Sequence, residues 1–136
     1  MIEEEEYNDL DDEPEPSGEL TLQALAMPKD TNPNGDIFGG WLMSQMDLAG
    51  SVRASAIARG RVTTVAVGSM AFLRPVPVGA TISCYADVLS IGRSSIRILV
   101  DVWQYQPETN ERYKVTEGTF VYVAIDDNGR TRSISS

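Results

Sequence analysis

One aspartate stands out as a candidate for acid–base chemistry. Asp47 lies inside a stretch, residues 41–58, whose other members are mostly apolar or small. An ionised carboxylate in such a setting is costly unless it is paired or hydrogen-bonded, and proteins tolerate that cost mainly at functional sites or in structural ion pairs. A desolvated carboxylate also makes a stronger base for activating water. The alternatives are an ion pair with a neighbour such as Arg53, or a place on an exposed stripe of a helix.

The residue types that are missing narrow the chemistry further. The chain has 136 residues and no histidine, which excludes Ser-His-Asp and Cys-His catalysis and most zinc sites. Acid–base chemistry must then rest on carboxylates, tyrosines or lysines. The single cysteine, Cys84, lies in an alternating strand pattern, and we expect it to be a small core residue rather than a nucleophile. Asp47 therefore remains the leading candidate.

A glycine-rich loop, residues 34–40, comes directly before the apolar stretch. Unpaired N–H groups at a helix N-terminus favour negative charge, and Gly39 and Gly40, next to Phe38, would let a ligand approach that backbone closely. A reacting carbonyl group placed there would develop its oxyanion against these donors. The simpler alternative is that the glycines only permit a tight turn into the helix. Asp36 either orients a water or substrate, or caps the helix.

Arginines at two further places could hold phosphate groups. Arg93, Ser94 and Ser95 follow Gly92 in a predicted hairpin turn, so they would place a guanidinium and two hydroxyls at the edge of a sheet. Arg74, beside Pro75, could act in the same way. The alternative for the first group is an ordinary polar turn that leads into a surface strand.

The spacing of these groups predicts a site shared between two chains. Asp47 lies seven residues beyond Gly40, which is roughly 10 Å along a helix axis. A reacting carbonyl needs both the carboxylate and the amide donors within about 3 Å. One chain cannot easily bring them together, whereas amides from one chain and Asp47 from another can meet. We therefore expect the protein to form at least a dimer.

The pattern of the whole chain favours an α+β layout. We expect a first strand at 20–27, a helix at 41–58, and strands near 62–73, 80–90, 94–105 and 113–125, with a hairpin turn at 90–93. Consecutive strands joined by short turns pair antiparallel. A helix that is apolar or small on all sides needs cover on more than one face. A sheet curled around the helix supplies part of that cover, and a second copy of the chain would supply the rest.

Charge divides the chain into a tail and one domain. Residues 1–19 hold ten of the 20 acidic residues and no basic residue, whereas the remainder has ten acids and 11 bases. We therefore expect a disordered acidic tail at 1–19 and one domain at 20–136. The N-terminus lacks a basic and apolar leader, and no apolar run is long enough to span a membrane, which predicts a cytoplasmic protein. The basic residues do not cluster as a nucleic-acid footprint would.

Several segments together resemble a known family. Residues 26–32, 34–47, 60–67, 92–96 and 126–130 are similar to the bacterial acyl-CoA thioester hydrolases of the hotdog fold, which are relatives of the eukaryotic cytosolic acyl-CoA hydrolases. The resemblance covers roughly residues 20–134. It implies a long helix wrapped by a curved antiparallel sheet of about five to six strands, a dimer that doubles the sheet, and commonly a trimer of dimers. It implies hydrolysis of acyl-CoA without a metal or redox cofactor.

The resemblance also implies roles for single residues. Asp47 matches the catalytic carboxylate, Asp36 faces the thioester from the other protomer, and Gly39 and Gly40 supply the oxyanion contact. The segment from Arg93 to Ser95 lies along bound CoA. One departure is Gly68, where the family pattern has an acidic residue. Two other functions compete: a hotdog dehydratase, which generally needs a histidine that this chain lacks, and a non-catalytic acyl-CoA sensor.

Overall fold

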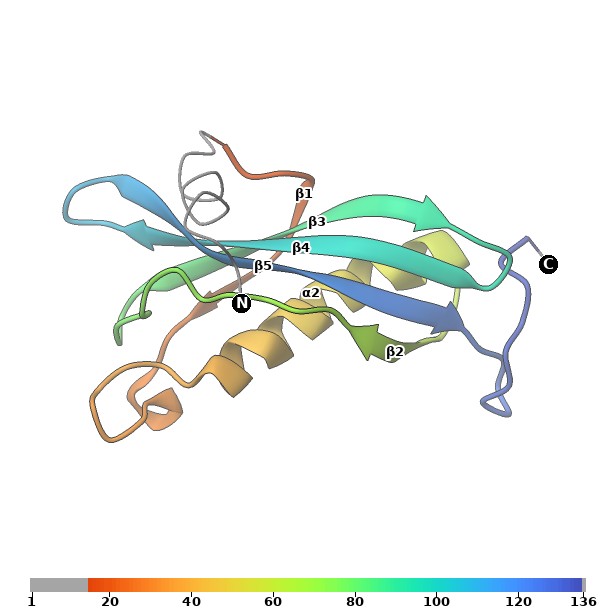
Figure 1. Cartoon of the computed structure of the whole chain (residues 1–136), viewed down its shortest axis with the longest axis horizontal. Helices are drawn as coiled ribbons and strands as arrows, with labels where there is room; N and C mark the ends of the chain where they lie inside the picture. The colour runs from red at the N-terminus through yellow and green to blue at the C-terminus, as the bar shows by residue number, and fades with distance from the viewer. Residues whose placement is uncertain (1–14, 136) are drawn as a thin grey trace.

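A computed structural model describes residues 15–135, which form one long helix and a five-stranded antiparallel sheet with the strand order β1-β3-β4-β5-β2 (Figure 1). The α+β layout predicted from the sequence is therefore confirmed. A short 3₁₀ helix, η1, precedes the long helix. The elements are β1 (Glu19–Leu25), η1 (Pro28–Asp30), α2 (Gly39–Ala58), β2 (Val62–Val67), β3 (Thr81–Ile91), β4 (Ser95–Gln106) and β5 (Glu111–Ala124).

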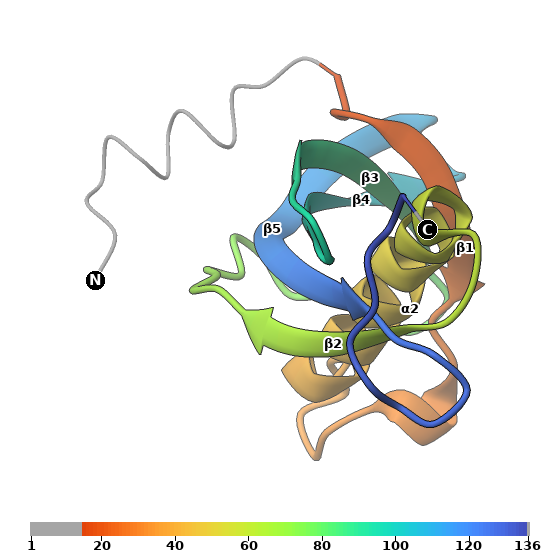
Figure 2. The ribbon, with the colours of Figure 1, turned by 90° about the vertical axis from the view of Figure 1, so that its right-hand side faces the viewer.

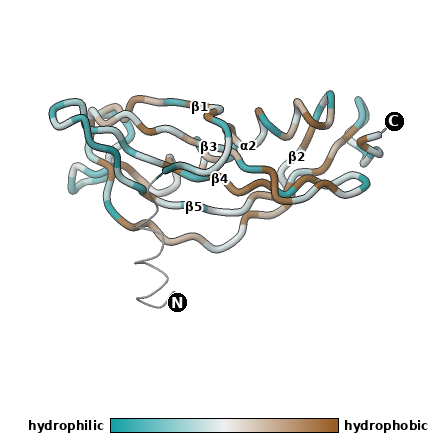
Figure 3. The backbone as a smooth tube through the Cα atoms, turned by 90° about the horizontal axis from the view of Figure 1, so that it is seen from above, coloured by the Kyte–Doolittle hydropathy of each residue, from teal (hydrophilic) through white to brown (hydrophobic). Residues whose placement is uncertain are grey.

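The sheet curls around α2, as the view along the molecule shows (Figure 2). Alternation along the strands sends one set of side chains toward the helix; in β4 these are Ile96, Ile98, Val100 and Val102, all fully buried. Cys84 of β3 belongs to the same core, as predicted. Hydrophobic residues recur along the strands and α2, whereas hydrophilic residues gather in the loops at the ends (Figure 3). The core thus lies between one face of the sheet and one face of the helix.

Helix α2 buries only part of its apolar surface within one chain. The side facing the sheet is made largely of small residues, which let the helix lie close to the strands; the buried residues are Leu42, Met46, Ala49, Gly50, Ala54 and Ala58. On another side Leu48 is 54% and Val52 51% exposed. Each large apolar side chain left in water forgoes about 1.5–3 kcal/mol of burial. The expectation that this helix needs cover from a second chain agrees with these exposed side chains.

Several predicted boundaries were wrong. The strand expected at 62–73 ends at Val67, because residues after Gly68 leave the sheet edge. The segment then contacts β5 through isolated bonds, such as Thr116 Oγ1–H to Ala71 O at 2.7 Å and Leu73 N–H to Val115 O at 2.8 Å. The first strand, expected at 20–27, spans Glu19–Leu25. The helix begins at Gly39 rather than residue 41, so Gly39 and Gly40 form its first turn. Glycine is a weak helix former, but the first turn costs it little because that turn's N–H groups have no helical partner in any case.

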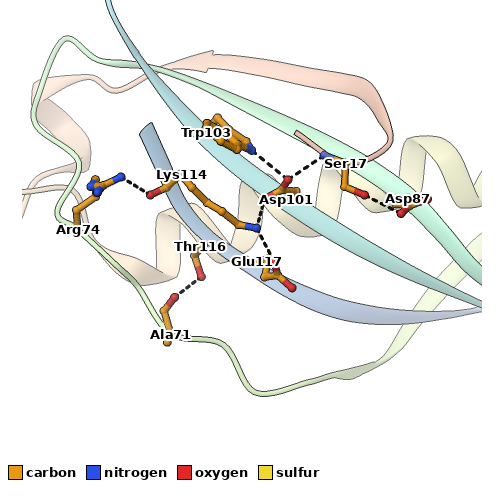
Figure 4. A network of polar contacts seen from close by, with 9 residues as sticks. All are labelled: Ser17, Ala71, Arg74, Asp87, Asp101, Trp103, Lys114, Thr116 and Glu117. Atoms are coloured by element: carbon orange, nitrogen blue, oxygen red, sulfur yellow. Dashed lines mark hydrogen bonds and ion pairs between the residues drawn. The ribbon is translucent and has the colours of Figure 1, made fainter. Parts of the chain in front are cut away.

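A buried polar cluster holds the segment before β1 against the outer face of the sheet (Figure 4). Asp101 and Lys114 are both 1% exposed and form an ion pair of 3.3 Å, and Lys114 Nζ lies 2.6 Å from a Glu117 carboxylate oxygen. Trp103 Nε1–H and Ser17 N–H each donate to Asp101 Oδ2 at 3.0 Å. These bonds offset the cost of burying the charges. The disordered tail predicted for 1–19 lies mostly outside the described residues, but Ser17 is bonded and β1 already begins at Glu19.

Candidate active site

Asp47 lies in the middle of α2 and faces β2. Thr64 of β2 donates its hydroxyl to Asp47 Oδ1 at 2.6 Å. Arg53, one possible ion-pair partner, instead reaches Glu19 at 3.5 Å. The carboxylate is half-buried rather than fully desolvated in the single chain, because the neighbouring Leu48 side of the helix is uncovered there. Asp47 is thus oriented by a neutral hydroxyl, and no cation among residues 15–135 neutralises it.

Tyr122 supports the same part of the helix from β5. Its hydroxyl donates to Asp47 O at 2.8 Å, and it pairs with Thr64 across the β2–β5 ladder. Burial, followed by the charge on Asp47, raises the pKa of the Tyr122 phenol, so it stays a neutral donor. The ring lies directly against Gly50, where an added Cβ would overlap the phenol oxygen. Glycine at this position is therefore what allows the tyrosine to reach the helix backbone.

Thr64 and Tyr122 were not predicted from the sequence to be site residues. Each carries a hydroxyl among valine neighbours in a predicted strand, which is a weak signal in the sequence. Their relation to Asp47 depends on the pairing of β2 with β5, which places Thr64 opposite Tyr122, 58 residues later in the chain. A register shift between Thr64 and Ala66 lies directly beside this contact, and such bulges re-aim side chains near functional sites.

The first turn of α2 presents two unpaired amides. Phe38 occupies the N-cap position with an extended backbone and no capping side chain, and its carbonyl accepts from Trp41 N–H at 3.1 Å and Leu42 N–H at 3.3 Å. Within residues 15–135 the N–H groups of Gly39 and Gly40 have no acceptor. An added Cβ at Gly40 would meet nothing within 4 Å, whereas one at Gly39 would contact the Phe72 ring at 3.5 Å. Two N–H donors at the positive end of the helix dipole are therefore without a partner among the described residues.

The loop that carries Asp36 is fixed by its backbone. Asn32 Oδ1 accepts from Asp36 N–H at 3.1 Å, Asn32 N–H donates to Asp36 O at 2.7 Å, and Ile37 N–H donates to Val76 O at 3.0 Å. Phe38 occupies the N-cap position and no side chain caps the helix, so the alternative in which Asp36 caps it is wrong. No hydrogen bond from residues 15–135 reaches the Asp36 carboxylate. This half-buried carboxylate is available to a water or ligand.

The structure places the two predicted arginine sites at opposite ends of the molecule. Arg74 lies near the start of α2, where its guanidinium donates to Lys114 O at 2.8 Å and stacks 5.1 Å from the Tyr113 ring centre. The turn with Arg93, Ser94 and Ser95 lies near the end of α2, since Ile134 N–H donates to Arg93 O. The helix between them has 20 residues, about 30 Å. One chain therefore does not assemble all predicted site residues into one pocket.

No three or more histidine, cysteine, aspartate or glutamate side chains come together as a metal site within the described residues. None of the helices in residues 15–135 combines the length and apolar character needed to cross a membrane.

The comparisons with known proteins agree on one family. The model of the thioesterase superfamily matches residues 34–111, more than half of the chain. The acyl-CoA thioester hydrolase YciA of Salmonella typhimurium is 53% identical over 122 residues, which cover 88% of this chain and 92% of the relative.

Solved structures that resemble this chain are also thioesterases. An aspartate-to-alanine mutant of HI0827, a hexameric broad-specificity acyl-coenzyme A thioesterase, matches with a TM-score of 0.85 and 54% identity, covering 87% of each chain. Cj0915, a hexameric hotdog-fold thioesterase of Campylobacter jejuni, matches with a TM-score of 0.80 and 38% identity, covering 85% of this chain and 90% of its own. The resemblance inferred from the sequence is confirmed: the chain has the hotdog fold and belongs to the thioesterase superfamily.

Proposed function

We propose that this protein hydrolyses acyl-CoA thioesters to a free carboxylic acid and CoA. The observation that carries the proposal is Asp47, a carboxylate that Thr64 orients at 2.6 Å and that no cation of the described residues neutralises. Such a group is suited to activate water or to attack a carbonyl itself. The names of YciA and HI0827, and the existence of an aspartate mutant of HI0827, support the same activity.

The catalytic site is proposed to form between two chains. The amides of Gly39 and Gly40 bind the developing oxyanion in one protomer, and Asp47 comes from the other. Asp36 lies beside these amides and orients the water or the thioester, and the exposed Phe38 ring borders the acyl group. Arg74, Arg93, Ser94 and Ser95 are proposed to contact CoA. The hexameric state of HI0827 and Cj0915 supports a homo-oligomer built from such dimers, and a trimer of dimers is the form we propose.

Release of CoA can be followed with a thiol reagent over acyl-CoAs of short, medium and long chain length. We expect turnover by the unchanged protein and a loss of at least about 100-fold in kcat for Asp47→Asn, because a positioned base contributes 10²–10⁴-fold. Asp30→Asn is the matched control, since within residues 15–135 the Asp30 side chain forms no hydrogen bond or ion pair and only its backbone groups bond to Met27 and Phe38. CoA binding without thiol release from any acyl-CoA would instead establish the non-catalytic sensor.

Isotope labelling distinguishes Asp47 as a general base that activates water from Asp47 as a nucleophile that attacks the thioester. In a single turnover in ¹⁸O-water, direct attack by an activated water places the label in the product acid. If Asp47 attacks first, CoA leaves and an anhydride forms; water that attacks the aspartyl carbonyl of this anhydride then labels the Asp47 carboxylate, and the acid leaves with an unlabelled oxygen from Asp47. Mass spectrometry of the product and of the peptide containing Asp47 distinguishes these outcomes.

A further inference from the structure

A network of polar contacts runs through the sheet from the segment before β1 to the loop that follows β2 (Figure 4). It begins on the outer face, at the buried polar cluster around Asp101, and ends at the loop of residues 71–74. The buried members of this network have no part in the proposed reaction. A buried ion pair is by itself weak evidence of stability. The contacts of the network indicate a second role, which is to hold that loop.

The inner end of the network depends on an extra residue in β5. Residues 102–103 of β4 pair with Thr116 and Lys114, so Val115 has no partner on β4. A bulge of this kind leaves the extra residue outside the ladder of the sheet. The Val115 carbonyl instead accepts from Leu73 N–H at 2.8 Å. The bulge thus supplies a hydrogen bond to a segment that has already left the sheet edge.

The two neighbours of Val115 hold the same loop at its ends. Thr116 donates its hydroxyl to Ala71 O at 2.7 Å. The Arg74 guanidinium donates to Lys114 O at 2.8 Å. Three consecutive residues of β5 therefore bond to the loop, and the position of the loop follows the position of the bulge.

The loop borders the first turn of α2. The Phe72 ring lies against Gly39, where an added Cβ would be 3.5 Å from the ring. The Gly39 amide is one of the two donors proposed for the oxyanion, and Arg74 is a proposed CoA contact. A shift of the loop would therefore displace groups that meet the substrate, whereas Asp47 is held separately, by Thr64 at 2.6 Å.

On the outer face, the Lys114 side chain fixes the same bulge. Its Nζ lies 3.3 Å from Asp101 Oδ1 and 2.6 Å from a Glu117 oxygen. Asp101 Oδ1 accepts no hydrogen bond within residues 15–135, so its charge there is balanced by Lys114. Asp101 Oδ2 accepts from Ser17 N–H and Trp103 Nε1–H, both at 3.0 Å. Loss of the Ser17 donor would leave a buried carboxylate short of one bond and would shift it toward Lys114.

We infer that Ser17, Asp101 and Lys114 are positioning residues, which hold the loop 71–74 in the place that substrate binding requires. This inference rests on the proposed function. None of the three contacts the proposed reacting groups. Ser17 acts through Asp101, Asp101 acts through Lys114, and Lys114 acts through the bulge of β5. The segment before β1 is in this way connected to the far side of the sheet.

Substitutions at the two ends of the network can separate these contacts. Ser17→Pro removes the N–H donor to Asp101, in a segment whose preceding residue is already proline. Ser17→Ala is the matched control, because it loses only the hydroxyl bond to Asp87, 2.8 Å, and keeps the N–H. Thr116→Val removes the hydroxyl that holds Ala71 and keeps the shape of the side chain, whereas Thr116→Ser keeps the donor.

Steady-state kinetics on one acyl-CoA tests the connection. For Ser17→Pro and for Thr116→Val we expect KM to rise about three- to tenfold, as for loss of one hydrogen bond, with kcat unchanged. Ser17→Ala and Thr116→Ser should stay within about twofold of the unchanged protein, below the effect of one lost hydrogen bond. The double variant should be no worse than the weaker single variant, because both changes release the same loop. Effects that multiply, as for independent sites, or an unchanged KM for Ser17→Pro, would overturn the inference.

Hydrogen exchange tests the same connection without turnover. The Leu73 amide is bonded to Val115 O, so release of the loop should expose it. We expect the peptide with residues 71–74 to exchange about three- to tenfold faster in Ser17→Pro than in Ser17→Ala, with exchange in α2 unchanged. Equal exchange of this peptide in the two variants would contradict the connection. This measurement is valid even if no thioester is hydrolysed, so the proposed function and this inference can fail separately.

Discussion

At the scale of single residues, the candidate catalytic carboxylate depends on neutral hydroxyls. Thr64 binds a side-chain oxygen of Asp47, and Tyr122 binds the Asp47 carbonyl. Neither partner is a cation, and together they restrict the position of the Asp47 side chain and backbone. A lysine or arginine in the place of Thr64 would hold Asp47 more strongly and would weaken it as a base. The Thr64 hydroxyl beside Asp47 is therefore consistent with a catalytic role for this carboxylate rather than with a structural ion pair.

Replacing Thr64 by valine should impair turnover without unfolding the protein. Valine keeps the shape and removes the hydroxyl, and a hydrogen bond to a charged group contributes about 1.5–3 kcal/mol, so we expect kcat to fall roughly 10- to 100-fold. Thr64→Ser retains the donor and should stay near the unchanged rate. Steady-state kinetics on one acyl-CoA measures both. An unaltered kcat for Thr64→Val would show that this bond does not position Asp47 for the reaction.

Cys84 should be inert in the folded protein. Burial, aided by the charge on Asp101, raises the pKa of its thiol from 9.0 to about 12, and the thiolate is the reactive form. At pH 8 we expect no reaction with a thiol reagent until denaturant is added, when one thiol per chain should react. The neutral thiol favours the folded state, so this contribution is complete below pH 9 and is lost as the pH rises from 9 through 12. Rapid labelling of the native protein, absent in Cys84→Ala, would contradict the burial.

At the scale of elements, the contact of α2 with the sheet depends on small residues. The Tyr122 ring of β5 reaches the helix backbone only because Gly50 has no side chain. The short strand β2 then places Thr64 beside Asp47, and it ends at Val67 before the chain turns away. Helix propensity alone would disfavour glycine in the middle of α2 by about 1 kcal/mol. Close packing, and not propensity, accounts for its presence.

Two glycine-to-alanine changes in the same helix should have opposite results. Gly50→Ala forces the Tyr122 phenol away, and overpacking of this kind costs about 1–3 kcal/mol, so the free energy of unfolding should fall. Gly40→Ala meets nothing within 4 Å and should keep or slightly increase stability, since alanine is the better helix former. Denaturant unfolding at one protein concentration compares them. Equal stability of the two variants would show that Tyr122 can move aside without cost.

At the scale of the whole molecule, the predicted site residues of one chain stay apart. The free amides lie at the start of α2, Asp47 lies in its middle, and the Arg93 turn lies near its end. The exposed side of α2, with Leu48 and Val52, is the surface that a second chain would have to cover. A shared site between protomers would bring the amides and the carboxylate together and would bury this surface at the same time.

Mixing two inactive variants should restore activity. Asp47→Ala lacks the carboxylate, and Gly39→Pro lacks an amide donor but suits the first helical position after the extended Phe38. A mixed dimer then contains one site with both functional groups and one with neither. Random assortment should recover about a quarter of the unchanged activity, since half of the dimers are mixed and each has half of its sites intact. No recovery in isolated mixed dimers would mean that each chain forms its own site.

Much of the fold follows from the sequence by itself. The change from a period of two to an apolar helix after residue 40, and back again after residue 60, specifies one helix and a set of antiparallel strands. Boundaries do not follow as directly: after Gly68 and Ser69 the run from Val62 resumes in apolar residues to Leu73, although the strand stops at Val67. Whether such a run stays in the sheet depends on a hydrogen-bonding partner, which a local pattern does not contain.

The sequence by itself determined the kind of chemistry, since a chain without histidine whose central apolar helix carries one aspartate has few other candidates. Only the tertiary structure decided what holds that aspartate. Thr64 and Tyr122 are 58 residues apart and become neighbours through strand register, and Gly60, Asp126 and Arg132 meet in one pocket only after the sheet has closed around the helix. Residue types are local and can be read in order, whereas contacts between distant segments depend on how those segments pack.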